Sequence, residues 1–196
     1  MFRFVLIMVS FALPAHAEPV PLSDLSKYLN ALTTAQTDFV QYNSDGSRSR
    51  GTLHIQRPGR MKFEYAPPNE ALVLANANTV AIFDGKSNAE AQKFPLKRTP
   101  LNLILGRSID LADSSMVSGH SETPDGLTVV TARDPKNPDV GSIELYFTSE
   151  PVALTQWVIT DEGGNRTGID LGPLDQSVSY PNWYFSINRE ETLRAN

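Results

Sequence analysis

The chain of 196 residues contains no cysteine. Disulfide bonds are therefore excluded, and with them the small disulfide-rich extracellular module as a class of protein. A chain without covalent cross-links must be held together by its own hydrophobic core. Its length is sufficient for one domain of ordinary size.

Histidine is scarce as well, and only His54 and His120 follow the N-terminal segment. We expect His54 on the polar face of a strand, as a surface or hydrogen-bonded residue. His120 lies in an expected loop, Ser118–Glu122, without the Gly-x-Ser-x-Gly elbow of a Ser–His catalytic pair. No cluster of three or four His, Cys and acidic residues marks a zinc site. The sequence predicts no enzyme, no metal site and no cofactor.

The chain has no excess of basic residues, since 17 Lys and Arg stand against 22 Asp and Glu. Nucleic-acid binding requires a basic stripe, so we expect no nucleic-acid partner. Long apolar runs are missing too. No segment reaches the ~20 apolar residues of a membrane-spanning helix.

The N-terminus has the pattern of a cleavable secretory signal. Arg3 supplies a positive charge, Phe4–Leu13 form a short apolar core, and Ala15-His16-Ala17 matches an A-x-A cleavage site. The apolar core is too short to span a bilayer. The alternative is a buried N-terminal helix.

We therefore expect residues 1–17 to be a signal peptide and residues 18–196 to form a single domain. No cysteine follows the cleavage site, so the chain cannot be lipidated there and should be released as a soluble protein. An exported protein without disulfides fits the bacterial periplasm better than an extracellular setting.

The segment Gly51–Pro68 has the pattern of a β-hairpin. Apolar and polar residues alternate on both sides of Arg57-Pro58-Gly59, a turn sequence in which Pro fixes φ and Gly accepts positive φ. One face of the hairpin is apolar, with Leu53, Ile55, Met61, Phe63 and Tyr65. The polar face can meet water, so the apolar face must cover either a core or a ligand.

Two short helices are expected. The first is Leu22–Leu32, where leucines recur along one stripe and Ser23 or Asp24 can cap the N-terminus. The second is Thr99–Leu105, with Thr99 as the cap, Pro100 at the first helical position and Gly106 in the left-handed conformation at the end. This second helix is mostly apolar, so it must be buried or cover a hydrophobic cavity.

The rest of the chain has the pattern of short strands separated by turn residues. This pattern predicts one large, curved antiparallel sheet. The first expected strand begins at Phe39–Tyr42, before the central hairpin. The later expected strands are Ala71–Ala75, Thr79–Phe83, Glu90–Phe94, Leu127–Ala132, Ser142–Phe147, Leu154–Thr160, Arg166–Leu171 and Trp183–Ile187. The aromatic residues Phe63, Tyr65, Trp157, Trp183, Tyr184 and Phe185 are interpreted as sheet core rather than as a stacking platform. The charged end, Arg189–Asn196, is expected to fray.

Several of these segments resemble the periplasmic outer-membrane lipoprotein carrier family (LolA). The resemblance covers most of the mature chain, from Asp24 to Phe185, and only the hairpin with its Arg57-Pro58 turn is specific. The matching segments are Phe39-Val-Gln41, Gly51-x-Leu53-x-Ile55-x-Arg57-Pro58, Val80-Ala-Ile-Phe-Asp84, Thr99-Pro-Leu-x-Leu-Ile-Leu105 and Val158-x-x-Asp-x-x-Gly164.

The resemblance implies a mainly β (α+β) fold, an incomplete antiparallel β-barrel that is strongly curved and covered by short lid helices. It implies a monomeric periplasmic chaperone that carries lipoproteins with their acyl chains shielded. Its partners are then an inner-membrane ABC-type release complex and, where present, an outer-membrane receptor. The soluble carrier is preferred over that receptor, which is itself a lipoprotein and needs a cysteine after its signal.

The resemblance also implies site residues. The inner sheet face is assigned Leu53, Ile55, Met61, Phe63 and Tyr65, and the lids are assigned Leu25, Leu29, Leu101 and Ile104. Arg57 matches the family arginine that hydrogen-bonds lid backbone in the empty state. The alternative for Arg57 is a surface turn residue.

Two other functions stay open at this point. A general carrier of lipids or other hydrophobic ligands with the same half-barrel has the same pattern of residues. A secreted hydrolase is the second alternative, weakened by the missing nucleophile and base.

Overall fold

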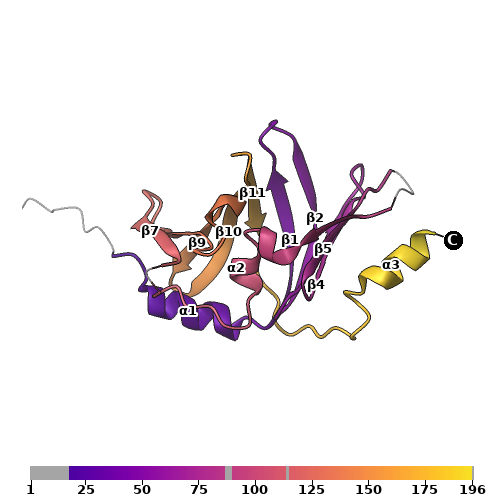
Figure 1. Ribbon diagram of the computed structural model, residues 1–196. Coiled ribbons are helices and arrows are strands. Elements are labelled where there is room, and N and C mark those ends of the chain that lie inside the picture. The colour runs from indigo at the N-terminus through magenta and orange to yellow at the C-terminus, as the bar shows by residue number, and fades with distance from the viewer. Residues whose placement is uncertain (1–17, 87–89, 114, 196) are drawn as a thin grey trace, which may run out of the picture.

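The computed structural model describes residues 18–86, 90–113 and 115–195, and the expected signal segment lies outside them. One antiparallel sheet dominates the fold (Figure 1). Its strands in chain order are β1 (Thr34–Tyr42), β2 (Arg48–Gln56), β3 (Arg60–Tyr65), β4 (Leu72–Asn76), β5 (Thr79–Phe83), β6 (Gln92–Pro95), β7 (Val117–Glu122), β8 (Thr128–Ala132), β9 (Ser142–Ser149), β10 (Val152–Thr160) and β11 (Arg166–Leu171).

The sheet consists of two meanders joined in the middle. Its order is β6-β5-β4-β3-β2-β1-β11-β10-β9-β8-β7, so every neighbour is also a chain neighbour except the pair β1 and β11. The ends β6 and β7 do not pair with each other, and the barrel stays open. The predicted incomplete antiparallel barrel is confirmed.

The sheet curls strongly enough for distant strands to meet. Phe63 on β3 and Trp157 on β10 lie with ring centroids 6.3 Å apart, although β2, β1 and β11 separate their strands in the sheet. Strands are ~4.8 Å apart in a sheet, so a flat sheet would hold these rings much farther apart. The contact therefore crosses the interior of the concave face.

The central hairpin forms as the alternation predicts. Gly51 pairs with Tyr65 and Gln56 with Arg60, so the apolar residues of both strands share one face. Gly59 closes the turn with φ of 72°, a left-handed conformation that Gly adopts without steric cost. The expected turn at Arg57–Gly59 is confirmed.

Two helices lie against the concave side: α1 (Leu22–Ala31) and α2 (Asn102–Leu105), the latter preceded by the short 3₁₀ helix η1 (Leu96–Arg98). A second 3₁₀ helix, η2 (Pro138–Val140), precedes β9. Within the described residues, no helix combines the length and apolar character needed to cross a membrane.

The ends of these helices differ from the prediction. Pro21 occupies the N-cap of α1 without a side-chain hydrogen bond, so neither Ser23 nor Asp24 caps it. Thr99 instead bonds the carbonyl of Leu96, and α2 starts only at Asn102. Gly106 has φ of −56°, so the predicted left-handed end is wrong. Its carbonyl is used in a tertiary contact, which decides the local backbone in place of a helix cap.

The C-terminal segment covers the outer face of the sheet. It runs from the end of β11 to α3 (Ile187–Arg194), which lies beside β4 and β5 (Figure 1). Phe185 is fully buried there in a second hydrophobic cluster that includes Leu72, Leu74 and Phe83. These strands are therefore covered on both faces.

Three strand and end predictions are wrong for reasons of tertiary contact. Trp183–Ile187 is not a strand, because Phe185 inserts into the outer cluster. The charged end does not fray over the described residues. Ser186 caps α3 through the amide of Arg189, and Glu191 pairs with Lys93 at 2.7 Å. The expected loop around His120 is strand β7, held by pairing with β8.

Candidate functional site: the concave face and its lid

The apolar face of the central hairpin is the floor of the concave side. Leu53, Ile55, Met61 and Phe63 are all buried, and Tyr65 is half-buried. Alternation places these side chains together on one face, and the curl of the sheet directs them inward. The phenolic group of Tyr65 stays satisfied by donating to Gln41 at 2.5 Å, and burial raises its pKa to about 12.

The helices bring their apolar residues onto this floor. Leu25 and Leu29 on α1 and Ile104 on α2 are buried in the same hydrophobic cluster as the floor, and Leu101 packs partly buried against it. The structure thus brings together all nine apolar residues of the predicted site. In this conformation they pack closely as a core.

Arg57 joins the sheet to both helices. Its guanidinium donates to the carbonyl oxygens of Leu29 and Leu32, at the end of α1, and to that of Gly106, just after α2. The Nη2–Gly106 oxygen distance is 2.7 Å. Carbonyls at helix ends lack partners within the helix and carry partial negative charge, which favours a cation.

The charge of Arg57 is partly buried. Burial lowers the pKa of its guanidinium from the ordinary value, and the group stays charged at neutral pH because that value is so high. Nε of Arg57 is buried without a hydrogen-bond partner among the described residues. This arrangement therefore leaves one donor unpaired, which costs free energy.

Backbone bonds of the same turn reinforce the contact. The amide of Arg57 donates to Thr33 at 2.7 Å, and the amide of Gly59 donates to Leu105 at 2.9 Å. Arg57 is therefore not the surface turn residue of the alternative interpretation. Its turn touches the end of α1 on one side and the end of α2 on the other.

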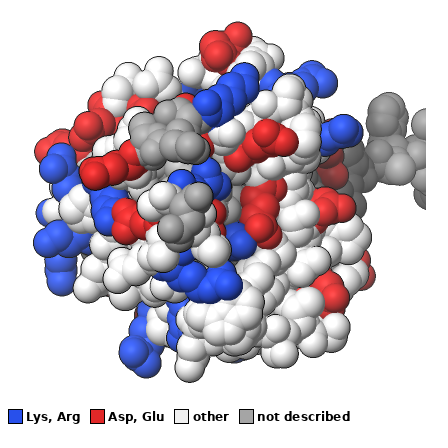
Figure 2. Space-filling model, turned by 90° about the vertical axis from the view of Figure 1, so that its right-hand side faces the viewer, with Lys and Arg blue, Asp and Glu red and all other residues white. Residues whose placement is uncertain are grey.

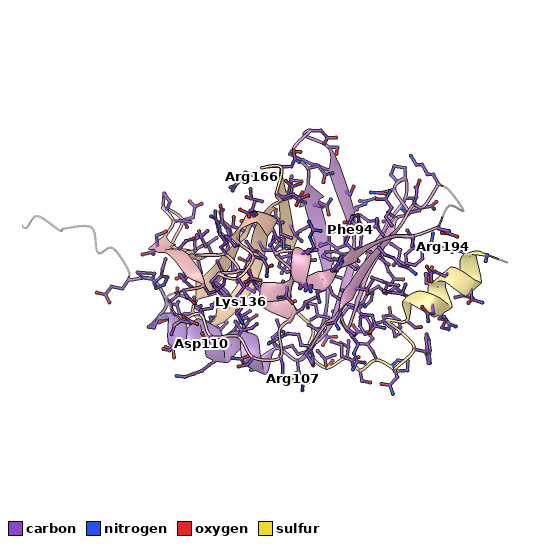
Figure 3. All side chains as sticks on the ribbon, viewed as in Figure 1. Phe94, Arg107, Asp110, Lys136, Arg166 and Arg194 are labelled. Carbon is purple, nitrogen blue, oxygen red and sulfur yellow. The ribbon has the colours of Figure 1, made fainter. Side chains whose placement is uncertain are left out.

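Helix α1 is also bonded to the loop that follows α2. The side-chain amide of Asn30 donates to the carbonyl of Ile109 at 2.7 Å and accepts from its amide at 2.9 Å. One helical turn earlier, Ser26 accepts from the amide of Leu111 at 2.9 Å. Asp110, between these two residues, is labelled beside α1 in Figure 3.

We call these contacts between α1 and the loop after α2 the lid tie, defined by Ser26, Asn30, Ile109 and Leu111. Sequence reasoning missed it. The available signal was a polar pair at i and i+4, Ser26 and Asn30, next to the leucine stripe of α1. That spacing places both side chains on one helix face, but nothing local identifies the backbone that they bond.

A family model decides the relationship of the chain to known proteins. The model described as "Outer membrane lipoprotein carrier protein LolA" matches residues 30–188. The chain belongs to this family. The matched range contains the whole sheet, the Arg57 turn and α2, and it begins at Asn30 of the lid tie. LolA carriers are non-enzymatic transport proteins, so the expectation of a carrier rather than an enzyme is confirmed.

Curated relatives agree with LolA membership at low sequence identity. The outer-membrane lipoprotein carrier protein of Methylococcus capsulatus is 24% identical over 179 residues, covering 87% of this chain and 79% of that protein. The carrier of Chromobacterium violaceum is 27% identical over 184 residues, with 89% and 85% covered. Among solved structures, a DUF1329 family protein from Desulfovibrio piger has a TM-score of 0.52 at 9% identity, covering 86% of this chain and 97% of that one. This last likeness concerns the fold alone.

A polar cluster lies on the opposite face of the LolA hairpin. His54 is buried there, with Nε2 at 2.8 Å from Glu64 and Nδ1 at 3.1 Å from the hydroxyl of Tyr180. Tyr184 donates to Glu64 at 3.2 Å, and Lys62 lies 2.7 Å from the same carboxylate. The expected hydrogen-bonded histidine is confirmed, whereas a water-facing polar face is wrong here because the C-terminal segment covers it.

Electrostatics in this cluster follow from the partners. Hydrogen bonding to His54, with Lys62 also contributing, lowers the pKa of Glu64 to about 2. Burial, with the negative charges of Asp175 and Glu64, raises the pKa of Tyr180 to about 12, and burial and Glu64 raise that of Tyr184 further. The cluster fastens the C-terminal segment to β2 and β3.

The outer face also has open grooves. A pocket of about 490 Å³ lies over β1, β2 and β11, lined in part by Asp38, Val40 and Arg50. Acidic and basic side chains are interspersed on the α3 side of the molecule (Figure 2). The pocket lies on the face opposite the predicted site, since Val40 points away from the floor and is exposed.

Proposed function

We propose that this chain shields the acyl chains of lipoproteins beneath its lid and carries them from an inner-membrane ABC-type release complex to the outer membrane. Membership of the LolA family, whose proteins are periplasmic carriers, supports the proposal. One observation carries it. A single cation, Arg57, holds two helical segments at their backbone over an apolar sheet face.

The energetics require a surface that can be covered and uncovered. Each CH₂ of a lipid chain that leaves water contributes about 0.8 kcal/mol, so a chain of about fifteen methylenes contributes ~12 kcal/mol before costs. A carrier must hide such a chain and still release it. In the proposal, the acyl chains replace the lid residues on the floor, and the contacts of Arg57 reform after release.

The proposal assigns roles to the predicted residues. Acyl chains contact the floor residues, and the lid residues move with α1 and α2. Residues 1–17 are removed on export, residues 18–196 act as one monomeric domain in the periplasm, and an outer-membrane receptor takes the cargo where one is present. The floor residues are Leu53, Ile55, Met61, Phe63 and Tyr65, and the lid residues are Leu25, Leu29, Leu101 and Ile104.

The test uses the chain from Glu18 onward with a synthetic triacylated lipopeptide and the unacylated peptide as the control. We expect the protein to keep the lipopeptide in solution and to elute with it as a stable complex, and to ignore the control. Failure to retain the lipopeptide contradicts the proposal. Mass spectrometry of material that co-purifies from a periplasmic extract separates the two carrier classes, because a general carrier of hydrophobic ligands yields free lipids in place of lipoproteins.

A further inference from the structure

Trp157 lies at the centre of the concave side. It is on β10, opposite Leu145 on β9 and Ile169 on β11, and its side chain is 0% exposed. Its ring meets Phe63 edge to face, with 6.3 Å between centroids and 86° between planes. Because this contact crosses the interior of the curled sheet, the indole faces the space that the lid covers.

The indole nitrogen of Trp157 is an unpaired donor. Nε1 is buried and has no hydrogen-bond partner among the residues that the structure describes. Indole N–H can only donate, and buried tryptophans usually find an acceptor. An unpaired buried donor forfeits its hydrogen bond to water, so it calls for an explanation.

No acceptor among the described residues is bonded to Nε1 in the closed state. The cluster that holds Trp157 is built from hydrophobic residues of the two helices and of both halves of the sheet. The hydroxyls of Tyr28 and Tyr65, which pack against it, bond to Leu154 and Gln41. Phenylalanine would provide a similar flat ring without a donor. The donor therefore becomes useful only when something that carries an acceptor enters the space between floor and lid.

We propose that Nε1 of Trp157 donates a hydrogen bond to a carbonyl oxygen at the head of a bound acyl chain. The inference rests on the proposed function and names a polar contact within that site. An acyl chain is attached through an ester or an amide, and its carbonyl oxygen would lose its bond to water on entering an apolar space. Pairing it with Trp157 satisfies two groups at once.

The test compares two ligands that differ in one carbonyl. They are 1-palmitoylglycerol, an ester, and 1-O-hexadecylglycerol, its ether counterpart. We expect the protein to bind the ester roughly three- to tenfold more tightly than the ether, the range of one neutral hydrogen bond. Trp157→Phe should reduce this ratio to about one. N-palmitoylethanolamine, an amide, shows whether the amide carbonyl is bound with the same preference over the ether.

A matched control separates the hydrogen bond from packing. Phe63→Leu removes bulk beside Trp157 and leaves the indole in place. It should weaken ester and ether alike and preserve their ratio. Using a ratio within each variant cancels any loss of stability, which affects both ligands equally.

A spectroscopic readout follows the proton directly. The chain has two tryptophans, and Trp183 is 53% exposed, so Trp183→Phe leaves Trp157 as the only indole signal in a ¹⁵N spectrum. We expect its N–H resonance to move downfield with the ester and not with the ether.

The outcomes are distinct. Equal binding of ester and ether by the unmodified protein, or an ester preference that survives in Trp157→Phe, overturns the inference and leaves the proposed function standing. If the protein binds none of the three ligands and no lipopeptide either, the proposed function and the inference fall together.

Discussion

Nη2 of Arg57 donates to the carbonyl oxygen of Gly106 at 2.7 Å, and thereby joins the turn between β2 and β3 to the end of α2. The same guanidinium bonds carbonyls at the end of α1. One side chain of the sheet thus contacts both segments of the lid. Its removal should loosen both without disturbing the hairpin, whose strands pair independently of it.

The first prediction concerns Arg57→Leu. We expect the variant to fold and to accept lipoprotein but to release it poorly, because the closed empty state loses charged hydrogen bonds and so becomes less favourable. The loss should be about 1–3 kcal/mol, and hence up to roughly two decades in the ratio of loaded to empty protein. A reconstituted transfer assay measures it.

Arg60→Leu is the control for this variant. Arg60 begins β3 and its guanidinium bonds Gln56 within the same hairpin at 2.8 Å. It should transfer lipoprotein like the unmodified chain. Release by Arg57→Leu at the unmodified rate would count against the role assigned to Arg57.

The second prediction concerns the floor, through Phe63→Glu. A charge on the floor should abolish lipoprotein acceptance, because acyl chains must lie there. The melting temperature should fall only modestly, since a lid that opens allows water to reach the carboxylate. Thermal unfolding and a binding assay on the same variant test both expectations.

Phe185→Glu is the contrasting variant. Phe185 is fully buried in the outer cluster, with no lid to open over it, so an unpaired charge should cost several kcal/mol or prevent folding. Equal damage to stability in both variants would mean that the floor is an ordinary core.

The third prediction concerns the lid tie, through Asn30→Ala. The substitution removes both hydrogen bonds to Ile109, together worth about 1–3 kcal/mol. We expect residues 107–111 to exchange their amide hydrogens about one to two decades faster, while the amides of β2 and β3 keep their rates. Hydrogen exchange followed by mass spectrometry measures this.

Lys27→Ala is the matched substitution on the exposed side of α1, where Lys27 pairs with Asp24 at 2.8 Å. Such a surface pair contributes little to stability. Exchange in residues 107–111 should therefore stay unchanged. If Asn30→Ala behaves like Lys27→Ala, then the tie does not hold the two segments together.

The fourth prediction concerns acid. Glu64 has its pKa lowered to about 2 in the folded protein, so the stability that its carboxylate contributes is present above its ordinary pKa and is lost as the pH falls toward 2. We expect the C-terminal segment to loosen from β2 and β3 over this range. Limited proteolysis or hydrogen exchange of residues 180–195 against pH measures it.

Glu64→Gln should remove the acid dependence, because an amide does not titrate. The variant starts with a looser segment at neutral pH and changes less as the pH falls. A segment that loosens identically with and without the carboxylate would show that another group controls it.

The hairpin and its site could be predicted from sequence, because their information is local. Alternation fixed which residues of β2 and β3 share a face, and Gly59 marked the turn. The leucine stripe indicated α1 in the same way. The role of Arg57 needed the family resemblance, since nothing in a turn sequence names distant carbonyls as partners.

Other features depend on contacts between distant segments. Strand β7 has few apolar residues and forms because β8 offers an edge to pair with. The covering of His54 depends on Tyr180 and Tyr184, more than 120 positions away. The unpaired nitrogen of Trp157 is invisible in a sequence, which indicates that a residue is buried but not whether its polar atom has a partner.

The second hydrophobic cluster, outside β4 and β5, affects how the lid can open without unfolding the sheet. Lifting the lid wets one side of these strands, while Phe185 and Ile187 keep the other side dry. Opening then moves the lid while the sheet stays in place, and it remains a local fluctuation well short of global unfolding. Because the cluster keeps its outer face packed, the sheet can expose its concave face to water and still stay folded.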